Sequence, residues 1–144
     1  MRSKLIYDGP QRTFAVVMET DDEALSNLLA FAKEEKLSAA EVTGIGALRG
    51  AVLGYFDWQT KEYERITVEE QVEVLNLTGN VALDGDGEPK LHLHIVLGRR
   101  DGTAHGGHLL EAHVRPTLEV IVTESPAHLQ RRSDPETGLA LIRI

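Results

Sequence analysis

The chain has 144 residues, no cysteine and a formal net charge of -8 at pH 7. Its length suits one domain with its own core, so we expect a single domain over residues 1–144. The lack of cysteine excludes disulfides and thiolate metal sites, and the negative charge disfavours binding a polyanion. No apolar stretch is long enough to span a membrane, and we expect a soluble, cytoplasmic protein.

The N-terminal quarter carries signals for strands and then for a helix. Short apolar runs at residues 5–7 and 14–18 predict two strands joined by an Asp-Gly-Pro turn. Thr20 and Glu23 have the spacing of a capping box, with Thr20 as the N-cap. Apolar residues then recur at helical intervals, which predicts one amphipathic helix with a stripe formed by Leu25, Leu28, Leu29 and Ala32.

From residue 39 onward the apolar period becomes that of strands. Strands are predicted at residues 40–48, 51–58, 62–68 and 70–83. The glycine-rich stretch before Gly50 lacks the spacing of a dinucleotide or phosphate loop. Within it, Arg49 is interpreted either as an anion contact or as a surface salt bridge.

The C-terminal part is predicted to hold two further strands, at residues 112–123 and 139–144. Pro116 favours an edge position or a bulge in the first of them. The polar segment between them contains Arg131 and Arg132, interpreted as solvated loop charges. Many strands and one or two helices predict an α+β fold with a mainly antiparallel sheet.

Four of the six histidines lie between residues 91 and 111. The order Leu-His-Leu-His at 91–94 is that of a strand, so His92 and His94 point to the same face. Residues 99–103 predict a hairpin loop; if Gly98 then pairs with Ala104, His94 lies opposite His108. Opposed residues have Cβ atoms roughly 4.5–5.5 Å apart, so the three imidazoles can share one metal ion.

Three neutral imidazoles with an open fourth position suit zinc or another divalent transition metal. The same register sends His105 to the other face, so His105 is the weaker ligand candidate unless the following glycines form a bulge. The alternative interpretation is a solvent-facing strand whose histidines pair with backbone or carboxylate groups.

In order and spacing, four stretches resemble the plants-and-prokaryotes-conserved (PPC) domain family: residues 44–49, 73–80, 92–94 and 106–111. The resemblance covers nearly the whole chain and implies a single sandwich-like domain with an antiparallel sheet. It also implies a homotrimer and, as in stand-alone prokaryotic members, a metal site on His92, His94 and His108. Plant relatives add a basic AT-hook that this sequence lacks, so no direct nucleic-acid partner is expected.

Two functions are weighed on this basis. The first is a non-enzymatic, metal-binding homotrimer that recognises itself or a protein partner. The second is a metal-dependent enzyme, lyase or decarboxylase-like, acting on a small anionic carbonyl compound, because the PPC fold is similar to that of acetolactate decarboxylase. If this chain is such an enzyme, its Glu111 or Glu73 would transfer protons and its Arg49 would anchor the anion. A DNA-associated role would need a basic surface that the sequence does not show.

Overall fold

The computed structural model describes residues 1–144 as a nine-stranded sheet with one helix. In chain order the elements are β1 (Arg2–Tyr7), β2 (Thr13–Glu19), α1 (Ala24–Glu34), β3 (Ala39–Asp57), β4 (Glu62–Val68), β5 (Val72–Leu83), β6 (Pro89–Gly98), β7 (Ala104–Glu124), β8 (Gln130–Ser133) and β9 (Ala140–Arg143). All pairings are antiparallel except the single β5–β8 contact. The α+β fold with a mainly antiparallel sheet is therefore confirmed.

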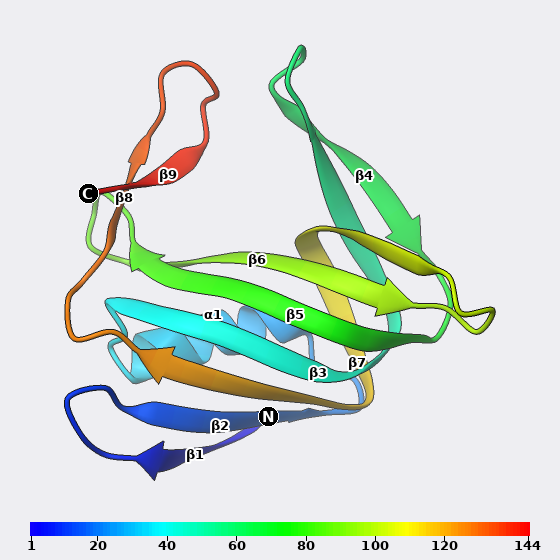
Figure 1. Cartoon of the computed structure of the whole chain (residues 1–144), viewed down its shortest axis with the longest axis horizontal. Helices are drawn as coiled ribbons and strands as arrows, with labels where there is room; N and C mark the ends of the chain where they lie inside the picture. The colour runs from blue at the N-terminus through cyan, green and yellow to red at the C-terminus, as the bar shows by residue number, and fades with distance from the viewer.

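Four strands of the sheet close on one another. β3 pairs with β5, β5 with β6, β6 with β7, and β7 again with β3. Figure 1 shows β3 and β7 curving out of the plane in which β5 and β6 lie. The strands and the helix surround one core of 27 buried apolar residues. The ring fixes β6 from both sides, because β6 pairs with β5 on one edge and β7 on the other.

Helix α1 covers one face of the sheet. Its buried residues are Ala24, Leu28, Phe31 and Ala32, and the Phe31 ring meets the Phe14 ring edge to face at a centroid distance of 5.2 Å. The predicted Thr20 cap is wrong: Glu23 is the N-cap, and its carboxylate accepts hydrogen bonds from the backbone N–H groups of Leu25 and Ser26. No helix of the structure combines the length and the apolarity needed to cross a membrane.

Two long strands replace pairs of predicted shorter ones. The predicted strands at residues 40–48 and 51–58 are joined in β3, which ends at Asp57, and residues 104–124 are continuous in β7. Register shifts between β3 and β7 let both strands bend without ending. Pro116 lies at one of these shifts, as the bulge prediction required, but β7 pairs with β2 and β3 on its two sides and is no edge strand there.

The predicted polar connection near the C-terminus is in part a strand. Residues 130–133 form β8, which pairs with β9, and a contact with β5 attaches this hairpin to the sheet. The interpretation of Arg131 as a solvated charge is wrong, because Arg131 is only 4% exposed. Arg132, its neighbour on β8, is exposed as expected.

Candidate metal centre

The hairpin of β6 and β7 carries the three predicted histidines in the predicted register. Gly98 pairs with Ala104 and His94 with His108. The leucine and isoleucine side chains that alternate with the histidines on β6, Leu93, Ile95 and Leu97, are buried in the core. A shift of one residue would exchange these apolar side chains with the histidines, so the core fixes the face on which the imidazoles lie.

His92, His94 and His108 form one compact cluster, in which one ring nitrogen from each lies within 4.8 Å of the other two. The ring centroids are 5.1 Å apart for His92 and His94, and for His92 and His108, and 5.4 Å apart for His94 and His108. The Nε2 atoms of His92 and His94 are separated by 3.1 Å. Two nitrogens on one tetrahedral zinc ion lie about 3.3 Å apart, so this spacing suits a shared metal.

Burial keeps two of these imidazoles in the form that binds a metal. It lowers the pKa of His108 from 6.5 to about 4, with smaller contributions from His92 and His94. Burial, the nearby positive charge of Arg131 and His94 also lower the pKa of His92. The Nδ1 atom of His108 is buried without any hydrogen-bond partner, and the Tyr63 ring stacks on this imidazole at 4.7 Å. A neutral imidazole with an unsatisfied nitrogen is a fitting ligand for a metal ion.

A cavity of about 280 Å³ adjoins the histidines. His92 and His108 form part of its wall, together with Tyr63 of β4, Arg131 of β8 and Leu139 to Leu141. Sequence reasoning missed Arg131 as a site residue. No local signal could have found it, since its position beside the histidines depends on how the β8–β9 hairpin docks onto β5.

The other candidate site residues lie elsewhere, and none of them lines this cavity. Glu111 is 2.7 Å from the Nε2 atom of His113 and 3.8 Å from Arg65. Glu73 is exposed on β5 opposite Gly98.

Two further candidates also stand apart from the cluster. Arg49 lies 3.8 Å from Asp21, which corresponds to the salt-bridge interpretation. His105 is exposed opposite Leu97 and is no member of the histidine cluster.

The fold and the cluster together define a class: an α+β domain with a three-histidine candidate metal centre on a hairpin of its sheet. The chain belongs to the Plants and Prokaryotes Conserved domain family, whose family model matches residues 6–126. The family resemblance of the sequence motifs is thereby confirmed. No protein of curated function matches the chain.

Three solved structures illustrate the likeness. A plant- and prokaryote-conserved protein of Pyrococcus horikoshii is 35% identical, with 92% of each chain covered and a TM-score of 0.86. A metal-containing protein of Archaeoglobus fulgidus is 33% identical, with 100% of this chain and 99% of that chain covered and a TM-score of 0.85. A candidate DNA-binding protein of Bacteroides thetaiotaomicron is 32% identical over 98% of this chain and 96% of that chain, with a TM-score of 0.87.

Proposed function

We propose that His92, His94 and His108 bind one zinc ion and that the protein is a homotrimeric metal-binding domain. The observation that carries the metal proposal is the convergence of three imidazole nitrogens within 4.8 Å, without a carboxylate in the set. Imidazole ligands suit zinc and its neighbours in the transition series, whereas magnesium and calcium prefer oxygen. Three ligands leave a fourth position open, where a bound zinc ion would supply a Lewis acid.

Two further observations support this assignment. The buried Nδ1 atom of His108 lacks a partner within the protein, as expected of a nitrogen reserved for a ligand. The Archaeoglobus protein that shares 33% identity with this chain is described as metal-containing.

The test is zinc content measured by elemental analysis on protein purified without a histidine tag, stripped with a chelator and reloaded. We expect about one zinc ion per chain, and weakening of zinc binding by at least about tenfold in His92→Ala, His94→Ala and His108→Ala. His105→Ala is the matched control, because His105 is exposed on the same hairpin but outside the cluster. Failure of the wild type to bind zinc, or full retention of zinc by all three variants, would contradict the proposal.

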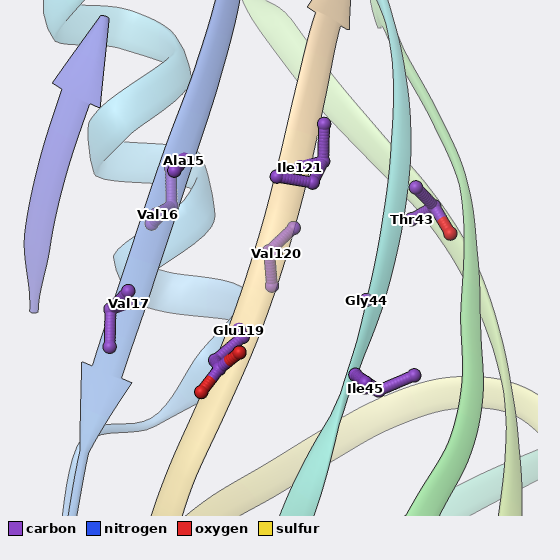
Figure 2. A pocket seen from close by; sticks show the side chains of 9 residues that line it. All are labelled: Ala15, Val16, Val17, Thr43, Gly44, Ile45, Glu119, Val120 and Ile121. Carbon is purple, nitrogen blue, oxygen red and sulfur yellow. The ribbon is translucent and has the colours of Figure 1, made fainter. Parts of the chain in front are cut away.

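Support for self-assembly comes from an apolar strip on the outer side of the sheet. Figure 2 shows this strip on three neighbouring strands, with Val17 on β2, Ile121 on β7 and Ile45 on β3. Ile45 is 60% exposed and Ile121 is 39% exposed, although both lie on strands in the middle of the sheet. One exposed carboxylate, that of Glu119, lies in the strip between Val17 and Ile45. A largely apolar exposed surface of this kind is typical of an interface between proteins. We infer that copies of this chain cover it, three of them as the family resemblance implies.

Metal-dependent chemistry on a small anionic carbonyl compound is the second candidate function. The observation that favours it is the cavity of about 280 Å³ beside His92 and His108, which would give a small molecule access to the bound metal. A lyase or decarboxylase-like activity can be tested by following the consumption of small 2-oxo and 2-hydroxy acids by NMR. Zinc-loaded wild type would show turnover that His94→Ala lacks.

Direct DNA binding is not proposed for this chain. The Bacteroides neighbour carries a candidate DNA-binding name, but this chain has a net charge of -8. Contacts to phosphates require clustered Lys and Arg side chains. The sequence has two pairs of adjacent arginines, at residues 99–100 and 131–132. In the first pair Arg99 forms an ion pair with Glu70, and in the second Arg131 is buried.

A further inference from the structure

Arg131 is a buried cation without a counter-ion. Its side chain is 4% exposed, and it belongs to none of the ion pairs of the chain. The two hydrogen bonds of its guanidinium go to neutral acceptors, the side-chain oxygen of Asn80 and the carbonyl oxygen of Ala140. A guanidinium has five N–H donors, so three of them lack an acceptor in the protein, including the buried Nε–H. A buried charge ordinarily has a partner, which here must come from outside the chain.

The cavity beside the histidines offers the place for that partner. Arg131 lines the cavity, and Asp84 is the only carboxylate in its wall. Asp84 is already engaged: its carboxylate accepts hydrogen bonds from the backbone N–H groups of Asp86 and Glu88 and lies 3.5 Å from Lys90 Nζ. The charge of Arg131 is therefore not neutralised by the wall, and a zinc ion on the histidines would add further positive charge.

The apolar part of the wall limits the kind of anion. Leu91 of β6 and Leu139 and Leu141 near the C-terminus contribute hydrocarbon surface. A volume of about 280 Å³ lies just below the range typical of sites for drug-sized ligands, so the ligand must be small. Lys90 also lines the cavity but pairs with Asp84 at 3.5 Å, so Arg131 is the one unpaired side-chain cation of the wall. One unpaired guanidinium beside leucine side chains matches a monoanion with a short hydrocarbon body better than a strongly hydrated phosphate dianion.

We propose that this cavity binds a small aliphatic monocarboxylate, whose carboxylate pairs with the Arg131 guanidinium next to the histidine cluster. The inference deepens the proposed function and rests on it for the second contact of the ligand, the zinc ion. It replaces Arg49 by Arg131 as the anion anchor. The β8–β9 hairpin that supplies Arg131 lies beyond residues 6–126, the region matched by the family model.

Butanoate is the probe, titrated into zinc-loaded and metal-free protein at constant ionic strength and followed in ¹H–¹⁵N NMR spectra. Butanamide, which has the same shape without the charge, and inorganic phosphate are titrated in parallel. Arg131→Met removes the cation, and Leu141→Trp fills the cavity while leaving Arg131 in place. Arg132→Met is the matched control, because it removes the neighbouring exposed charge on the same strand.

We expect saturable butanoate binding to the wild type and to Arg132→Met, with amide shifts centred on Asn80, Arg131 and Leu141. The dissociation constant should rise at least about tenfold in Arg131→Met and in Leu141→Trp, and butanamide should bind the wild type at least about tenfold more weakly than butanoate. If Arg131→Met does not fold, Leu141→Trp and the butanamide comparison decide the question.

Four results would overturn the inference: no saturable butanoate binding, unchanged affinity in a folded Arg131→Met, equal binding of butanamide, or tighter binding of phosphate than of butanoate. Titrating both the zinc-loaded and the metal-free protein distinguishes failure of the carboxylate inference from failure of the zinc proposal. If zinc does not bind, the metal proposal is lost, yet the comparison of wild type with Arg131→Met in the metal-free protein still decides whether the anion site exists.

Discussion

Among the three clustered histidines, His108 is the one whose protonation is most strongly opposed by its surroundings. Burial lowers its pKa from 6.5 to about 4, and the neighbouring His92 and His94 act in the same direction. The Tyr63 ring stacked on the imidazole contributes to that burial. In the folded protein the His108 imidazole is therefore neutral throughout the physiological pH range.

This shift predicts how the stability of the metal-free protein depends on pH. Between about pH 6.5 and 4 the unfolded chain binds a proton at His108 that the folded protein does not bind. The free energy of unfolding therefore falls as the pH is lowered through this window. His108→Asn cannot titrate, so its loss of stability between pH 7 and 4.5 should be smaller than that of the wild type by about 1–3 kcal/mol.

Denaturant unfolding of both metal-free proteins at the two pH values measures this difference. Both proteins contain the same carboxylates. The loss of stability that their protonation causes in acid therefore cancels in the comparison. Equal losses in wild type and variant would show that the folded protein does not hold His108 neutral.

Sequence and structure agree at the histidines and differ at Arg131 for a physical reason. The alternation of leucine and histidine on β6 and the loop length of the hairpin are local properties, and they place His94 opposite His108. The burial of Arg131 depends on the docking of β8 onto β5, whose contact joins Leu83 to Gln130. A polar four-residue strand carries no apolar period from which such docking can be predicted.

At the scale of elements, the pairing of β5 with β6 holds two of the three histidines in place. Gly79 of β5 pairs with Leu93, between His92 and His94. A Cβ atom on Gly79 would collide with the backbone carbonyl oxygen of His92. The lack of a side chain at this position allows the close approach of the two backbones.

Gly79→Ala should therefore push β6 away from β5 at His92. We expect a loss of about 1–3 kcal/mol in the free energy of unfolding of the metal-free protein, together with weaker zinc binding. Gly85→Ala is the control, because no atom lies within 4 Å of a Cβ built at Gly85. Denaturant unfolding and zinc titration measure both effects; equal stability of the two variants would contradict this role for Gly79.

The elements that sequence reasoning placed wrongly are those set by distant contacts. Glu23, not Thr20, caps α1, and its carboxylate also accepts a hydrogen bond from the backbone N–H of Ala112 on β7. The local capping-box spacing contains no information about β7. Likewise, Gly50 looks like a break between two strands, whereas the pairing with His113 continues β3 through it.

At the scale of the whole molecule, the apolar strip predicts the effect of charge on assembly. Ile45→Glu places a second carboxylate in the strip, opposite Glu119 of β7, and should convert a trimer into monomers, because burying two unpaired like charges in an interface is costly. Leu75→Glu is the control, since Leu75 is also exposed, at 55%, but lies on β5 and outside the strip. Light scattering during gel filtration should give the wild type and Leu75→Glu three times the chain mass of 15.9 kDa.

Wild-type protein that is monomeric at all concentrations would contradict the proposed assembly. A trimer that persists in Ile45→Glu would instead place the interface away from the strip. The metal proposal does not depend on either result, because all three histidines come from one chain.

X-ray absorption at the zinc K-edge of the zinc-loaded protein tests the three-histidine site most directly, since it observes the ligands themselves. We expect donor atoms at about 2.0–2.1 Å from the zinc ion. Three of the donors should show the outer-shell scattering of imidazole rings, and one further donor such as water should not. In His94→Ala the imidazole contribution should fall by one ring. A zinc ion surrounded by carboxylate oxygens, or an imidazole signal unchanged in His94→Ala, would show that the metal binds elsewhere and that the histidine cluster is not its site.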